Sequence, residues 1–169
     1  MRRTIALISL AALSAAAAWG GEVFTGGQVA EVIRLRLDRD EMLLESILDT
    51  IKKYKIEDGA VLTAAGTLQA CTFHAVANMK PKPEDKMMTR QGPLEILSLN
   101  GIIAGGEPHL HMTLGDNEGR ALGGHIEPGC KVLYRAEITI ARFSGPKVAR
   151  LPNKEGVPMM QRVPAGRKK

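Results

Sequence analysis

The sequence is poor in aromatic residues and in cysteine, and each scarcity excludes a class of protein. Aromatic side chains make up 4% of the 169 residues, too few for the stacking platforms of proteins that bind single-stranded nucleic acid. Two cysteines cannot build a disulfide scaffold or a four-thiolate zinc site. The remaining composition, 44% hydrophobic and 24% charged, is typical of one globular domain.

Long apolar runs are also scarce, and the one present predicts a cleaved signal peptide over residues 1–20. Two arginines precede a charge-free run over 4–19, about 16 residues, which is shorter than the roughly 20 that span a bilayer. Cleavage would leave no transmembrane segment and a net charge of +3. We therefore expect an exported protein, periplasmic or secreted. There Cys71 and Cys130 either pair or remain buried thiols.

Hydrophobic periodicity predicts one helix and a sheet. Leu44, Ile47 and Ile51 recur at helical spacing within a segment from about 40 to 54. Shorter apolar or alternating runs predict the strands, over 32–37, 61–64, 68–77, 94–103, 109–114, 121–126 and 132–143. One helix against an antiparallel sheet makes a single α+β domain over 21–145. After it, the basic, proline-containing segment 146–169 is expected to be a flexible, extended tail.

Three of the four histidines, His109, His111 and His125, fall within 17 residues. Residues two apart on a strand share a face, so His109 and His111 point the same way. A three-residue hairpin loop over 117–119, ending in glycine, would set His125 opposite His111. A two- or four-residue loop would turn His125 to the other face. The fourth, His74, is read as a half-buried structural histidine.

Three imidazoles on one face of a sheet predict a metal centre. Neutral histidine binds Zn²⁺ at about 2.0–2.1 Å, and three protein ligands leave one position open for water or a small ligand. Zinc is expected, although another divalent transition metal would accept the same ligands. The alternative is that the three histidines hydrogen-bond across a subunit interface.

A family resemblance agrees with these motifs. The chain carries EILSLNG at 95–101, HLH at 109–111 and GGH at 123–125, and over about 32–142 it resembles the plant- and prokaryote-conserved (PPC) domain. The resemblance implies an α+β fold with a curved antiparallel sheet, assembled as a homotrimer. In prokaryotic members it implies a metal cluster, which falls here on His109, His111 and His125. Plant members add an Arg-Gly-Arg-Pro segment that binds DNA, and this sequence contains none.

The sequence therefore predicts an exported, trimeric PPC-domain protein that binds zinc, with no catalytic residue assigned. One alternative is a metal-dependent hydrolase, in which Glu95 or Glu107 would be the base. The other is DNA binding, as in the plant members of the family. The small net charge and the expected export both argue against DNA as a partner.

Overall fold

The computed structural model describes residues 21–163, so the expected signal peptide and the last six residues lie outside the described part of the chain. No helix within residues 21–163 is long and apolar enough to cross a membrane. The elements, in chain order, are β1 (Gln28–Asp38), α1 (Leu43–Lys53), β2 (Asp58–Val76), β3 (Asp85–Ala104), β4 (Glu107–Asp116), β5 (Ala121–Ile126), β6 (Lys131–Ser144), β7 (Val148–Pro152) and β8 (Pro158–Arg162).

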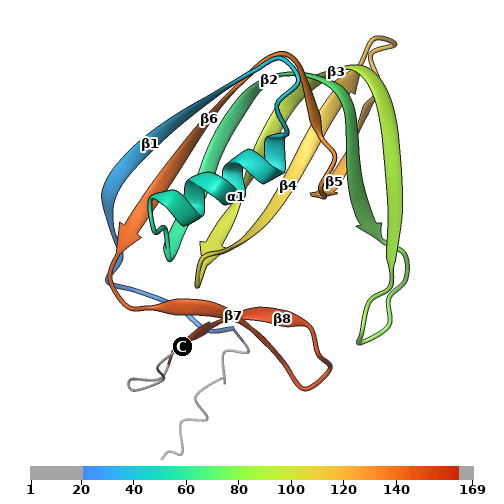
Figure 1. Cartoon of the computed structure of the whole chain (residues 1–169). Helices are drawn as coiled ribbons and strands as arrows, with labels where there is room; N and C mark the ends of the chain where they lie inside the picture. The colour runs from blue at the N-terminus through green and yellow to red at the C-terminus, as the bar shows by residue number, and fades with distance from the viewer. Residues whose placement is uncertain (1–20, 164–169) are drawn as a thin grey trace, which may run out of the picture.

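The first six strands form one antiparallel sheet in the order β1-β6-β2-β3-β4-β5. The sheet curves strongly, and α1 lies inside the curve (Figure 1). β5 also pairs with the C-terminal end of β2, so that β2, β3, β4 and β5 form a closed ring of paired strands. The predicted α+β class with one main helix is confirmed.

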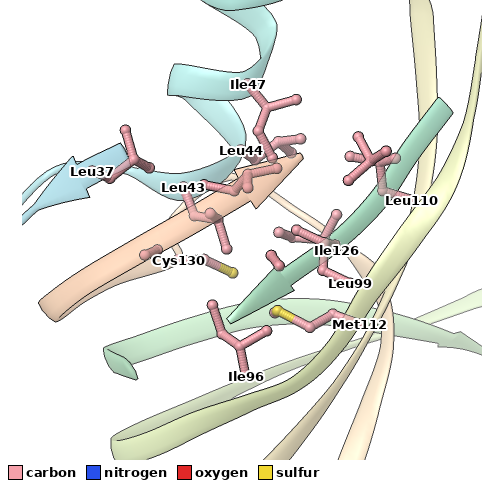
Figure 2. Packing of buried hydrophobic residues seen from close by; sticks show 14 of the residues in the cluster. Leu37, Leu43, Leu44, Ile47, Ile96, Leu99, Leu110, Met112, Ile126 and Cys130 are labelled. Carbon is pink, nitrogen blue, oxygen red and sulfur yellow. The ribbon is translucent and has the colours of Figure 1, made fainter. Parts of the chain in front are cut away.

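The core lies between α1 and the concave side of the sheet, as the close view shows (Figure 2). The helix buries Leu43, Leu44, Ile47 and Ile51, which include three of the positions expected from the periodicity. On β4 the alternate residues Leu110, Met112 and Leu114 are buried, whereas His109, His111 and Thr113 lie on the opposite face. The sheet therefore has an inner apolar face, and an outer face that carries the histidines.

Two predicted strands merge in the structure. The runs over 61–64 and 68–77 belong to the single strand β2, which continues through Gly66 with shifts in its pairing to β6. β2 and β3 extend past the sheet as a long two-stranded arm (Figure 1). Cys71 on β2 and Cys130, just before β6, form a disulfide, which settles the alternative that the sequence left open.

The segment after residue 145 is not an extended tail in its described part, and this prediction was wrong. Strands β7 and β8 pair as a hairpin whose turn is organised by Asn153. The Asn153 Oδ1 atom accepts hydrogen bonds from the backbone N–H groups of Glu155 and Val157. Pro152 and Pro158 are the paired residues next to the turn, so these prolines delimit the strands rather than prevent them.

Candidate metal centre

The β4–β5 hairpin has the predicted register. The backbone N–H of Asp116 donates to the carbonyl of Arg120 at 3.0 Å, which leaves a three-residue loop over 117–119. Gly119 adopts a left-handed conformation with φ of 79°, which only glycine and a few polar residues adopt readily. His125 consequently lies opposite His111.

The two glycines before His125 have a role that the sequence analysis did not identify. Gly123 and Gly124 directly precede His125 on β5. In the structure, a Cβ atom on Gly123 would collide with the carbonyl oxygen of Met112 on β4. A Cβ atom on Gly124 would collide with the carbonyl oxygen of His74 on β2. The glycines therefore allow β5 to fit between two neighbouring strands.

The three histidines of the predicted site come together on the outer face. The Nε2 atoms of His109 and His111 are 3.3 Å apart. The ring centres of His109 and His111 are separated by 5.1 Å, those of His109 and His125 by 5.1 Å, and those of His111 and His125 by 5.5 Å. His111 is exposed, whereas His109 and His125 are partly buried.

His74 and Glu127 extend this cluster. His74 lies opposite His125 in the β2–β5 pair, and its ring stacks on that of His125 at 4.5 Å. The Glu127 Oε1 atom is 2.7 Å from His74 Nδ1 and 3.5 Å from His125 Nδ1. Among the described residues, His74, His125 and Glu127 form the group whose ligand atoms all lie within 4.8 Å of one another. His125 thus belongs both to the predicted set and to this one.

Burial favours the neutral forms of His109 and His125. It lowers the pKa of His109 from 6.5 to about 4, with smaller contributions from the charge of Arg150 and from the neighbouring histidines. Burial is also the main reason that the pKa of His125 is lowered, while Glu127 acts in the opposite direction. Neutral imidazole is the form that binds a metal ion.

Glu95 and Glu107 were the two candidates for the base of a metal-dependent hydrolase, and they lie at different points of the sheet. Glu95 is exposed on β3 opposite Gly115. Glu107 begins β4 and accepts a hydrogen bond from Arg150 Nη1 at 3.1 Å. Arg150 comes from β7 and its side chain is only 11% exposed. Sequence analysis missed this arginine because it assigned the whole segment after 145 to a tail.

The curated relatives are much longer proteins. The chain is 33% identical over 110 residues to the bifunctional protein GlmU of Synechococcus sp. (strain JA-3-3Ab), covering 65% of this chain and 17% of the relative. It is 29% identical over 123 residues to GlmU of Synechococcus sp. (strain JA-2-3B'a(2-13)), covering 73% of this chain and 18% of the relative. The chain thus spans less than a fifth of these proteins.

Solved structures share the fold over nearly their whole length. A PPC protein from Pyrococcus horikoshii is 28% identical with a TM-score of 0.71, covering 85% of this chain and 99% of that one. A metal-containing protein from Archaeoglobus fulgidus is 25% identical with a TM-score of 0.69, covering 83% and 99%. The family model of the Plants and Prokaryotes Conserved domain, abbreviated PCC or PPC, matches residues 18–144. The chain belongs to this PPC family.

Proposed function

We propose that this PPC-domain protein binds one divalent transition metal ion, zinc, through His109, His111 and His125. The observation that carries the proposal is the placement of these three rings on the outer face of β4 and β5. Its role would be to hold the ion and present it to a small ligand, rather than to catalyse a reaction. The metal-containing relative from Archaeoglobus fulgidus supports this assignment.

The rings of His109, His111 and His125 are spaced nearly as they would be around one tetrahedral ion. Among the described residues their ligand nitrogen atoms do not all lie within 4.8 Å of one another, so the His125 ring has to turn toward the other two to share an ion. Three imidazoles that bind such an ion at about 2.1 Å have nitrogen atoms about 3.4 Å apart and ring centres about 5 Å apart. The Nε2 atoms of His109 and His111 are 3.3 Å apart, and the three ring centres are separated by 5.1 to 5.5 Å. Without an ion, two facing nitrogen atoms can share only one proton between them. The His109–His111 pair is therefore suited to a cation.

Glu127 fits the role of an outer partner that orients a ligand. Metal-bound histidines usually donate their second ring N–H to a carboxylate or carbonyl group. The His125 Nδ1 atom is buried without a hydrogen-bond partner, and Glu127 Oε1 is the nearby acceptor at 3.5 Å. A small rotation of the His125 ring would let Nδ1–H donate to Glu127 while Nε2 faces His109 and His111. The Oε1 atom of Glu127 is also 2.7 Å from His74 Nδ1, and the His74 ring stacks on the ring of His125.

His125 belongs to two candidate sets of metal ligands, and substitutions determine which of the two sets binds the ion. The purified protein is loaded with zinc, dialysed and analysed for metal content and affinity. We expect about one ion per chain, which the double substitution His109→Ala, His111→Ala abolishes. His74→Ala is the matched control, because it removes an imidazole from the same cluster but not from the proposed set. Glu127→Gln should retain the ion and weaken its binding by about 10- to 100-fold.

The reverse pattern would place the ion elsewhere. If His74→Ala and Glu127→Gln remove the metal while the double substitution keeps it, the ligands are His74, His125 and Glu127. Equal metal content in every variant would contradict both sets. Circular dichroism of each variant, recorded without metal, checks that a loss of binding does not reflect unfolding.

Export and assembly as a homotrimer complete the proposal. The Cys71–Cys130 disulfide supports export, because such bonds persist in oxidising compartments. Assembly is supported by apolar side chains exposed on β3, Leu97 at 56% and Ile102 at 36%. Ile102 lies opposite His109, so contact between copies would be close to the cluster. Light scattering and fractionation of the producing cells test the two expectations separately.

A further inference from the structure

The segment after the family domain brings a nearly buried cation to the edge of the histidine cluster. Arg150 lies on β7, beyond the matched residues 18–144. Its side chain is 11% exposed, and its Nη1 atom donates to Glu107 Oε1 at 3.1 Å. Burial of a guanidinium group is costly unless its N–H groups find acceptors. The position of Arg150 therefore needs an explanation.

Glu107 fixes where the guanidinium lies. Glu107 and His109 are two residues apart on β4, so they project from the same face with Cα atoms about 6.6 Å apart. A group bonded to Glu107 is consequently beside His109. The charge of Arg150 acts on both His109 and His125, lowering the pKa of each after the larger effect of burial, which agrees with this location.

The backbone that carries Arg150 is anchored on both sides of the residue. Ala149 packs on Gly105 in the β3–β4 turn, where an added Cβ would lie 3.0 Å from the Ala149 Cβ. Val148 is buried, and Lys147 Nζ is 2.9 Å from Glu57 Oε2. Gln161 on β8 donates to the carbonyl of Leu151 at 3.1 Å. The arginine is therefore held in place before any ligand arrives.

The bond to Glu107 uses only part of the guanidinium. This group has five N–H donors in a planar fork that matches carboxylate and phosphate oxygens. Nη2 and Nε of Arg150 donate to no residue within the described range 21–163. At the other end of the cluster the charges are acidic, with Glu127 between His125 and His74. At the His109 end the charge of Glu107 is paired with that of Arg150, so a negatively charged ligand there would meet the guanidinium donors that remain free.

We propose that the cluster binds a small oxyanion, with one oxygen at the open position of the metal and a second oxygen on the Arg150 guanidinium. The ligand class is a carboxylate or phosphate group, since both present two oxygens to such a fork. This inference rests on the proposed metal site, and it adds a residue outside the family domain as the determinant of ligand charge. A neutral ligand would form no charge-assisted hydrogen bond with Arg150, so this residue would not raise its affinity.

The test uses the protein loaded with Co²⁺, because the visible absorption of cobalt reports changes in its coordination and zinc absorbs no visible light. Acetate, inorganic phosphate and uncharged acetamide are titrated separately and followed by absorption and calorimetry. We expect at least one anion, but not acetamide, to bind and change the cobalt spectrum. The stronger of the two anions identifies the ligand as carboxylate or phosphate.

Substitutions then test whether Arg150 is responsible for the binding of the anion. Arg150→Gln should weaken anion binding by about 10- to 100-fold, the usual loss for a charge-assisted hydrogen bond, while cobalt affinity is kept. Arg150→Lys should recover part of this loss, because it restores the charge but not the planar fork. In Glu107→Gln the amide oxygen can still accept from Arg150 Nη1, so the guanidinium keeps its place and anion binding should be retained.

Each contrary result has a distinct meaning. Unchanged anion binding in Arg150→Gln would overturn the inference and leave the arginine as a tether for the hairpin. Cobalt-loaded wild-type protein that binds neither anion would also overturn it, while the metal site stands. Failure of the wild-type protein to take up cobalt is seen before any anion is added. That result would refute the proposed function and the inference built on it.

Discussion

The ring of His74 stacks on the ring of His125, with centres 4.5 Å apart and planes inclined by 20°. This contact joins β2 to β5, although the two residues are 51 positions apart in the sequence. It places Glu127 within reach of both rings. The outer face of the sheet therefore carries four histidines in a continuous cluster with the carboxylates of Glu127 and Asp85, the latter 3.6 Å from His74 Nε2. Within this cluster burial favours the neutral forms of His109 and His125, so their protonation should affect the stability of the metal-free protein.

Acidification should destabilise the metal-free protein between pH 6.5 and about 4. The pKa of His109 is lowered to about 4 in the folded protein, from 6.5 when the side chain is unperturbed. In this range the unfolded chain binds a proton that the folded protein does not, so stability is complete above pH 6.5 and falls as the pH decreases. Urea unfolding in the presence of a chelator measures the effect. His109→Gln should show a shallower dependence; an identical slope in both proteins would contradict the assignment.

The hairpin loop should tolerate asparagine at position 119 better than alanine. Gly119 has φ of 79°, and an added Cβ would meet no atom within 4 Å, so the cost of a side chain is purely conformational. Gly119→Ala should lower the free energy of unfolding by about 1 kcal/mol, and Gly119→Asn by less. Gly21→Ala is the control, since that glycine also has open space around it and no left-handed φ. Equal losses for alanine and asparagine would argue against a left-handed requirement.

Loss of the disulfide should destabilise the fold considerably. Cys71 and Cys130 are 59 positions apart, and closing a loop of that length contributes about 4 kcal/mol in the chain-entropy model. Denaturant unfolding with and without reductant measures the contribution. Cys71→Ala, Cys130→Ala should unfold at the same denaturant concentration in both conditions and resemble the reduced wild type. A wild-type protein insensitive to reductant would show that the bond adds little.

Two leucines on β3 offer a matched comparison of the two faces. Leu99 is fully buried, whereas Leu97 is 56% exposed. Leu99→Ala should lower the free energy of unfolding by about 2–5 kcal/mol through the cavity that it leaves. Leu97→Ala should change the stability of a single chain by about 0.5 kcal/mol or less. If Leu97→Ala instead weakens assembly in light scattering, that residue lies between copies.

Rules that involve only residues close together in the sequence were sufficient to predict the part of the site on β4 and β5. Strand alternation placed His109 and His111 on one face, and a glycine at the end of a three-residue loop set the register of His125. Both features depend on residues that are close together in the sequence, so the sequence pattern predicts them. The same reasoning located the helix to within a few residues, with its observed start at Leu43 rather than near 40.

The rest of the site depends on contacts between distant segments. His74 was set apart because no local pattern brings β2 against β5. A signal was nevertheless present: a bond between Cys71 and Cys130 would have placed His74 and Glu127, each three residues from a cysteine, near one another. Arg150 was missed for a different reason. Its segment was assigned to a tail because it is basic, contains prolines and has little apolar periodicity, whereas Pro152 and Pro158 flank the turn of a hairpin.

Strand β1 forms one free border of the six-stranded sheet, and the Asp85–Gln91 part of β3, which pairs with β2 alone, forms another. Within the described chain every strand of the six-stranded sheet has at least two partners except β1, which pairs with β6 alone. The β1 border carries the exposed cations Arg34 and Arg36, which repel a like strand from a second molecule. Pairing of two copies of this protein edge to edge along β1 is therefore disfavoured.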